Sequence, residues 1–362
     1  MKKIISLVLA LTMAMCAFTA CSGSKEEEKT ADGYAKELYL YNWSEYMSQE
    51  VLDLFEEEYG IKVIETTFES NDEMLAKLLA GGDSGYDIVV PTNFHIETLL
   101  ANDLLAEINW DNVPNFANID PAYVNPSYDP EQKYTVPYMG TVVTWIGNKA
   151  RLDKLGVEVH KMTDIANPKL KGEILMADDA TGNIGQGLIA LGYEPYCENV
   201  DEIMEAKDFL ISINDNVKAY TIPADAADGV ARGEAALAYA YSGNIMMAMQ
   251  QSDDVILVMD EEKVSLSIDT FVILKSSKHK EEAELFLNFL LRPEISAMLT
   301  TEFPYVSFNA AAVEYLPEEL ATSQMVVLSG DIKDRLYMLN NFNAEGGAAC
   351  VEAMTEVKTA RG

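Results

Sequence analysis

Six consecutive residues carry the groups that a protein uses to hold a small organic cation. Residues 41–46 read YNWSEY and place an indole, a hydroxyl, a carboxylate and two phenols just after a predicted strand. A carboxylate and a hydroxyl bind an ammonium group through charge-assisted hydrogen bonds, while aromatic rings attract the cation and cover neighbouring methylene groups. The segment is therefore a candidate contact for a positively charged ligand.

The charge balance of the chain suits the same kind of ligand. The 362 residues include 59 acidic and 26 basic side chains, and the formal net charge is −33. Such a charge repels nucleic acid and anionic membrane surfaces, so nucleic-acid binding is not expected. Solubility alone explains the charge equally well. The apolar share of 49 % allows a large core and suggests two domains.

The N-terminus has the pattern of an export signal. Two lysines precede an apolar stretch over residues 4–20, and small residues then lead to Cys21. This junction resembles a bacterial lipobox, in which the cysteine is acylated, although Phe18 stands where Leu is usual. We predict a signal peptide over residues 1–21 and a flexible tether over residues 22–36. The protein is then exported to the outer face of the cytoplasmic membrane or the periplasmic space, and only a lipid anchors it.

Two cysteines remain in the body of the chain, because Cys16 lies in the signal and Cys21 would carry the lipid. An exported setting permits a disulfide between Cys197 and Cys350. Their positions in the sequence leave open whether the two thiols approach each other.

Strand and helix patterns alternate from residue 37 onward. The first elements read strand, helix, strand, helix, strand, which is typical of a parallel sheet with helices packed on it. A second region with the same character follows an irregular excursion over residues 107–133. The predicted strands are 37–41, 61–67, 86–90, 173–177, 217–221 and 236–241, and the helices include 48–59, 71–80 and 280–291.

Two long extended segments connect these two regions. Residues 134–148 and 265–274 are each long enough to leave one domain and enter the other. Two lobes joined at a hinge leave a cleft between them, which is a natural ligand site. Ligands meet the carboxyl ends of strands in open α/β sheets, so residues 41–46, residues 91–95 and Asp179 should face this cleft.

Common catalytic and cofactor motifs are missing from the sequence. It has no Gly-x-Ser-x-Gly elbow, phosphate-binding Gly-Lys-Ser/Thr loop or dinucleotide fingerprint, so no cofactor is expected. The three histidines lack metalloprotease spacing, and no metal site is expected. We predict surface positions for His160 and His279 and a structural role for His95. A carboxylate-dependent hydrolase stays a minor alternative, because no acid and base pair stands out.

Six segments resemble the periplasmic spermidine/putrescine-binding proteins of ABC importers, and the resemblance runs in collinear order from about residue 37 to residue 358. The most specific pieces are YNWSEY at residues 41–46 and YDIVVP at residues 86–91. The segments are LYLYNWSEYMSQEVLDLFEEEYGIKVIETTFESNDEMLAKL, YDIVVPTNFHIETL, YTVPY, DTFVILKSSK, NFLLRPEISAML and EFPYVSFNAA.

The resemblance implies an α/β fold of the two-lobed, type II periplasmic-binding-protein class, in which each lobe is a mixed sheet flanked by helices and hinge strands join the lobes. Lobe I would contain residues 37–141 and 268–306, and lobe II residues 142–267 and 307–362. Such a protein is a non-catalytic monomer that captures a polyamine and hands it to ABC permease subunits. Ferric-ion or other small-amine binding by the same fold is the alternative.

Carried over by position, the resemblance also implies a set of ligand contacts. Trp43 would form a wall, and Ser44 and Glu45 would hold one terminal amine. Asp179 would hold the other terminal amine and Asp269 an inner or second one. The other implied contacts are Tyr46, Thr92, Phe94, Tyr241, Tyr305 and Asn343.

Structural explanations for these residues stay open. Glu45 could favour the start of the next helix through the helix dipole, and Asp179 could cap the helix that follows it. Tyr241 and Tyr305 could be core residues. Asp269 resists such an explanation, because a carboxylate inside an apolar strand needs a partner.

Three positions depart from the family pattern. Gly182 stands where an acid is expected, and Ser267 and Gly140 stand where tryptophans are usual. A lost ring removes about 0.5 to 2 kcal/mol of binding and a lost charged partner about 1.5 to 3 kcal/mol. The sequence therefore leaves open whether the ligand is putrescine, spermidine or another small amine.

Overall fold

One mixed sheet runs through the computed structural model, which describes residues 29–80, 84–259, 261–340 and 342–361. Its main strand order is β2-β1-β3-β9-β4-β7-β5-β6, while β8 and β10 pair with β4 and β11 pairs with β9. The strands are β1 (Glu37–Trp43), β2 (Lys62–Phe68), β3 (Ile88–Val89), β4 (Thr135–Asn148), β5 (Ile174–Ala177), β6 (Val217–Thr221), β7 (Leu237–Tyr241), β8 (Val255–Leu257), β9 (Val264–Ile273), β10 (Val306–Ser307) and β11 (Leu336–Met338).

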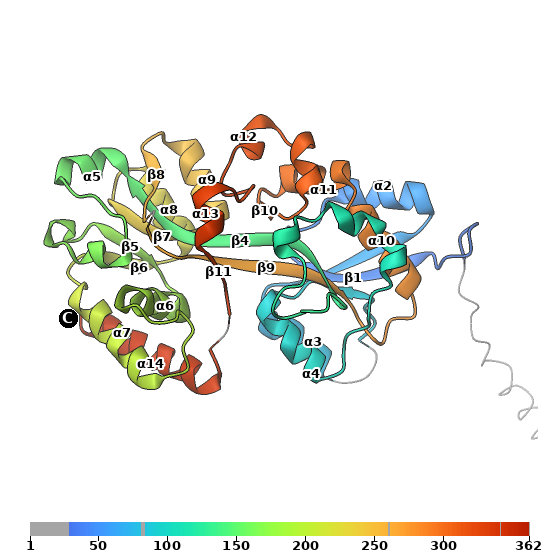
Figure 1. Cartoon of the computed structure of the whole chain (residues 1–362), viewed down its shortest axis with the longest axis horizontal. Helices are drawn as coiled ribbons and strands as arrows, with labels where there is room; N and C mark the ends of the chain where they lie inside the picture. Colours follow the sequence, from blue (N-terminus) through green and yellow to red (C-terminus); the bar gives the residue numbers. More distant parts are fainter. Residues whose placement is uncertain (1–28, 81–83, 260, 341, 362) are drawn as a thin grey trace, which may run out of the picture.

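The long strands β4 and β9 extend across both halves of the molecule (Figure 1). They pair antiparallel from Thr135 opposite Val272 to Val143 opposite Ser265. Strands β1, β2 and β3 continue the sheet on one side of this pair, and β7, β5 and β6 continue it on the other. The fold is therefore the α/β arrangement of two lobes joined by hinge strands that the sequence predicts.

Helices cover both lobes. Around the first lobe lie α2 (Gln49–Tyr59), α3 (Asn71–Leu79), α4 (Ile96–Ala101), α10 (Lys280–Leu290) and α11 (Pro293–Glu302). Around the second lie α5 (Lys149–Leu155), α6 (Ala180–Leu191), α7 (Val200–Ser212), α8 (Pro223–Ala231), α9 (Ser242–Gln251) and α14 (Ala344–Thr359). The short helices α12 (Glu318–Ala321) and α13 (Gly330–Arg335) lie near the junction, and single turns of 3-10 helix occur at η1 (Asn93–His95), η2 (Trp110–Asn112), η3 (Pro114–Asn118), η4 (Pro121–Tyr123), η5 (Met162–Ala166), η6 (Pro168–Leu170) and η7 (Ala310–Tyr315).

Local sequence signals explain where these elements begin and end. Helix α2 buries Val51, Leu52 and Phe55 on one face, as its periodicity predicts, and it ends where Gly60 adopts a φ of 68°. Both hinge strands and each helix and strand predicted above are confirmed to within two residues at each end. The irregular excursion contains the turns η2, η3 and η4.

The structure describes only part of the predicted signal peptide and tether. The signal peptide and Cys21 lie outside the described residues. Within the predicted tether, residues 29–36 form a turn against lobe I, in which Ala35 N–H donates to Glu282 Oε1 at 2.7 Å. In the described part of the chain, no helix has both the length and the apolar composition needed to span a membrane.

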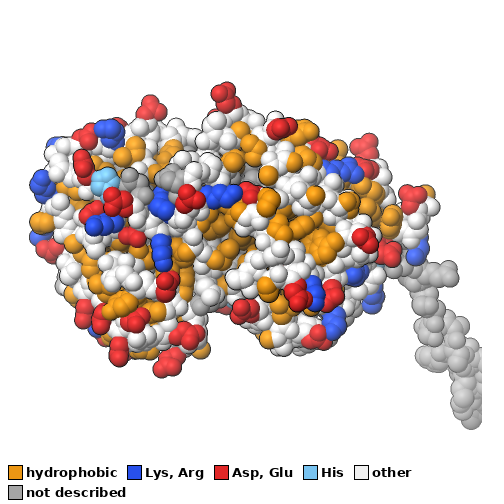
Figure 2. All heavy atoms as spheres, viewed as in Figure 1, with side chains coloured by type: hydrophobic (Ala, Val, Ile, Leu, Met, Phe, Trp, Pro, Cys, Tyr) orange, Lys and Arg blue, Asp and Glu red, His pale blue; other side chains and the backbone are white. Residues whose placement is uncertain are grey.

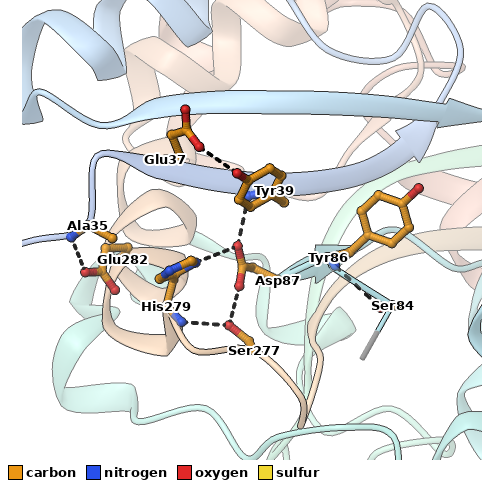
Figure 3. Close-up of polar contacts among 9 residues, drawn as sticks. All are labelled: Ala35, Glu37, Tyr39, Ser84, Tyr86, Asp87, Ser277, His279 and Glu282. Carbon is orange, nitrogen blue, oxygen red and sulfur yellow. Dashed lines mark hydrogen bonds and ion pairs between the residues drawn. The ribbon is translucent and has the colours of Figure 1, made fainter. Parts of the chain in front are cut away.

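A buried carboxylate ties strand β1 to the segment that leads into α10 (Figure 3). Asp87 accepts hydrogen bonds from Tyr39 N–H at 2.9 Å and from Ser277 Oγ at 2.6 Å, and it lies 3.1 Å from His279 Nδ1. The predicted surface position of His279 was therefore wrong, because a partner 192 residues away draws the ring inward. His160 is exposed, as predicted.

The two cysteines of the body are both free thiols. Cys350 is buried on α14, and burial raises its pKa to about 12. Cys197 is half-buried in the segment before α7.

Candidate functional site

Asp269 lies at the centre of a polar cluster in lobe I. Its side chain is only 8 % exposed. Thr92 Oγ1 donates to Asp269 Oδ1 at 2.6 Å, and the Tyr46 hydroxyl donates to Oδ2 at 2.8 Å. Burial raises the pKa of Asp269 from 3.8 to about 6, although the two hydroxyl donors oppose this shift. Among the described residues, the hydrogen-bond partners of this carboxylate are the two neutral hydroxyls, and neither is a lysine or arginine.

Aromatic rings flank this carboxylate. Tyr46 contacts Tyr305 edge-to-face at 4.9 Å between ring centroids and Tyr138 at 5.4 Å. The Tyr138 hydroxyl donates to the backbone carbonyl of Tyr46. Burial raises the pKa of Tyr46 well above its ordinary value, so the hydroxyl remains a neutral donor. Neutral rings and a carboxylate together form a suitable surface for an alkylammonium group.

The turn after β1 borders the same cluster. Trp43 is fixed by a hydrogen bond from Nε1 to the Val90 carbonyl at 2.9 Å. Ser44 Oγ donates to Glu69 Oε1 at 2.6 Å, so this hydroxyl has a partner that the sequence did not reveal. Glu45 is exposed and adopts a φ of 53°, a left-handed conformation that is uncommon for any residue other than glycine. Burial raises the pKa of the Tyr305 phenol, and the charges of Asp269 and Glu45 add to this shift.

A second group of predicted residues lies in lobe II. Asp179 is the N-cap of α6, where its Oδ1 accepts from Gly182 N–H at 3.1 Å and from Thr181 Oγ1 at 3.0 Å. The Asp179 carboxylate therefore does cap the helix that follows it, which was one of the two explanations left open by the sequence. Tyr241 ends β7 close to it, and burial together with the Asp179 charge raises the pKa of Tyr241 to about 12.

The strand registers place both groups on one face of the sheet. Tyr241 pairs with Val143 of β4, and Val143 pairs with Ser265 of β9. Paired side chains and alternate residues along a strand project to the same face, so Asp269 shares this face with Ser265 and Tyr241. Figure 2 shows the surface indented between the two lobes at the lower edge of the view.

Two predicted contacts are less closely associated with these groups. Asn343 is exposed at the start of α14, where its Oδ1 accepts from Gly346 N–H at 2.7 Å. Phe94 is half-buried and lines an open cavity of about 260 Å³ with Glu97 and Tyr128. The structure therefore brings Tyr46, Thr92, Asp269 and Tyr305 into direct contact, but it uses Asn343 as a helix cap.

Residues 50–325 match the family model described as bacterial extracellular solute-binding protein. The chain belongs to this family. It is 32 % identical to the spermidine/putrescine-binding periplasmic protein of Escherichia coli over 79 % of this chain and 82 % of that relative. It is 29 % identical to a putrescine-binding periplasmic protein of Pseudomonas aeruginosa over the full length of both chains.

A solved structure has the same fold as this chain. A spermidine/putrescine ABC transporter substrate-binding protein from Streptococcus pneumoniae superimposes with a TM-score of 0.80 at 26 % identity, covering 91 % of this chain and all of that one. These relatives are solute-binding proteins of transporters and not enzymes. The family resemblance and the non-catalytic character predicted from the sequence are confirmed.

Two departures from the family pattern have steric explanations. A Cβ at Gly182 would lie 2.4 Å from Asp179 Oδ2, so the Asp179 carboxylate already occupies the space of a side chain at residue 182. A Cβ at Gly140 would lie 2.4 Å from the Phe308 ring, and residue 140 pairs with Ile268 on the face opposite to Asp269. Neither position can accept the family residue without a rearrangement of its neighbours.

The sequence missed several residues that position the site. Asn71 Nδ2 donates to Thr92 Oγ1 at 3.0 Å and so orients the hydroxyl that meets Asp269. Burial raises the pKa of the Tyr128 phenol, and the charges of Asp129 and Asp269 add to this shift. The motif YTVPY, which contains Tyr138, could have pointed to the ring beside Tyr46. In lobe II the sequence also missed Tyr196 and Tyr337, whose ring centroids lie 6.2 Å apart.

The ferric-ion alternative gains no support from these tyrosines. Burial raises the pKa of Tyr241 and Tyr337 to about 12 and that of Tyr239 well above its ordinary value, so these phenols are neutral in the absence of a bound cation. Across the residues that the structure describes, no group of three His, Cys, Asp or Glu side chains could hold a metal ion.

Proposed function

We propose that the chain is the substrate-binding lipoprotein of an ABC transporter and captures putrescine or spermidine between its two lobes for import. Asp269 carries this proposal. It is a buried carboxylate whose two oxygens accept from the neutral donors Thr92 and Tyr46, and no cationic side chain is among its hydrogen-bond partners in the described residues. An ammonium group would supply the missing charge.

The remaining site residues fit the same ligand. Tyr46, Tyr305 and Trp43 would cover methylene groups, while Ser44 and Glu45 would hold one terminal amine. Asp179 would hold the other end from lobe II, with Tyr241 beside it. Thr92, Phe94 and Asn343 would line the same space. The names of the relatives support a polyamine as the ligand.

The proposal includes the cellular setting. Acylation of Cys21 would anchor a monomer at the outer face of the cytoplasmic membrane or in the periplasmic space. The loaded protein would then deliver its ligand to the ABC permease subunits. Lobe boundaries at residues 37–141 with 268–306 and at residues 142–267 with 307–362 remain part of the proposal.

Calorimetric titration tests the ligand class directly. We expect the purified protein, stripped of ligand by unfolding and refolding, to bind at least one of putrescine, cadaverine, spermidine and spermine. Lysine methyl ester serves as a control with a different shape and similar charge. An absence of heat and of any shift in the unfolding temperature with all four amines would rule out the proposed function.

The left-handed backbone at Glu45 gives a separate test of that residue. A non-glycine residue in this conformation costs about 1 kcal/mol, so Glu45→Gly should keep or slightly raise the free energy of unfolding. The same change removes a carboxylate from the site and should weaken amine binding about fivefold or more. Glu45→Gln keeps the backbone strain and should lose affinity without gaining stability. Unchanged affinity in both variants would remove Glu45 from the site.

A further inference from the structure

A ring that the family pattern places at residue 267 is absent from β9. Ser267 and Ser265 project to the same face as Asp269, and both hydroxyls donate to carbonyls of the neighbouring strand β4. The polar face between Asp269 and lobe II therefore carries two small side chains from β9, and another element must cover it.

Strand β11 supplies that cover. It pairs in parallel with β9, and Tyr337 is the direct partner of Ser265. Paired side chains share a face, and Ser267 is the next residue of β9 on that face, two positions beyond Ser265. Tyr337 therefore lies beside the position of the missing ring.

Further aromatic rings extend this cover toward Asp179. The ring of Tyr196 lies 6.2 Å from that of Tyr337 and 5.2 Å from that of Phe342. Burial raises the pKa of Tyr196 well above its ordinary value, and the neighbouring Tyr337 and the charge of Asp179 add to this shift. The Asp179 carboxylate occupies the space that a side chain at residue 182 would need. The start of α6 therefore presents the Asp179 carboxylate and no second acidic side chain at residue 182.

We propose that Tyr337, supported by Tyr196, forms the aromatic wall for the ligand chain in place of the ring missing at Ser267. This inference rests on the proposed function and deepens it. From Ser265 to Asp269 the strand spans about 13 Å, so only the far part of a long ligand reaches Tyr337 from Asp269. Tyr337 therefore selects for the triamine spermidine over the diamine putrescine.

Five variants test the wall by calorimetry with spermidine and putrescine. Tyr337→Ala should lower the affinity for spermidine about three- to tenfold and that for putrescine less than twofold. Tyr337→Phe keeps the ring and should bind both amines within about twofold of the parent protein. Tyr315→Ala, which removes a 57 % exposed tyrosine on η7, is the matched control and should change neither constant.

The fourth and fifth variants distinguish a ligand contact at Tyr337 from a purely structural role. Ser267→Trp alone should lower the affinity for spermidine, because its ring and that of Tyr337 compete for one space. The double variant Ser267→Trp with Tyr337→Ala should recover the affinity to within about threefold, as expected for coupled neighbours. Effects that add, or an unchanged spermidine-to-putrescine ratio in Tyr337→Ala, would overturn the proposal. If the parent protein binds neither amine, the proposed function fails instead.

Discussion

Replacing Asp269 by asparagine should weaken polyamine binding at least about tenfold. The substitution keeps the shape of the side chain but removes the charge that an ammonium group would meet. Loss of a hydrogen bond to a charged group costs about 1.5 to 3 kcal/mol, and 1.4 kcal/mol corresponds to tenfold in the dissociation constant. Calorimetry with the best-bound amine measures this effect.

The same variant should be more stable than the parent protein in the absence of ligand. Burial of the ionised carboxylate has a cost, which is why the pKa of Asp269 is raised to about 6. Removal of that charge should increase the free energy of unfolding at pH 7.5 by roughly 1 to 3 kcal/mol. The amide can still accept from Thr92, and the Tyr46 hydroxyl can turn to accept from the new amide N–H.

Asp87→Asn is the matched control for this experiment. Asp87 is also a buried aspartate of lobe I, but its partners are Tyr39, Ser277 and His279. Its replacement leaves buried donors without an acceptor and should lower the free energy of unfolding by about 1 to 3 kcal/mol. The dissociation constant of the folded protein should not change. If Asp269→Asn loses stability like Asp87→Asn and keeps its affinity, Asp269 is a structural residue.

Ligand affinity should fall as the pH is lowered through 6. In the ligand-free protein the pKa of Asp269 is raised above its ordinary value, so the folded state binds this proton more tightly than the unfolded state. The stabilising contribution of the group is complete below about pH 4 and is lost as the pH rises through about 6. An ammonium ligand requires the ionised carboxylate. The affinity for the ligand therefore rises with pH, whereas the contribution of Asp269 to folding stability falls.

Titrations between pH 5 and pH 8 measure this dependence. We expect affinity to be level above about pH 7 and about tenfold lower at pH 5, since protonation then competes with the amine. The amines themselves stay protonated across this range, because alkylammonium groups such as that of lysine have a pKa near 10.4. Asp269→Asn should bind weakly with little pH dependence between pH 5.5 and pH 8. A parent protein with level affinity down to pH 5 would contradict the role assigned to Asp269.

The sequence alone determined the elements and the class of fold. Apolar periodicity, Gly60 at a helix end and the two long extended segments are local signals, and each acts within a few residues. Asp269 also stood out locally, because a carboxylate in an apolar strand needs a partner wherever the strand lies. These features can therefore be predicted without knowing which distant residues pack against them.

The tertiary structure decided the contacts between distant segments. Tyr46 and Thr92 reach Asp269 across 223 and 177 residues, and Asp87 draws His279 inward across 192. Tyr337 meets the face of β9 only because β11 pairs with it in parallel, and no local pattern specifies that register. Side-chain partners of this kind depend on how the sheet assembles, so periodicity within one strand cannot identify them.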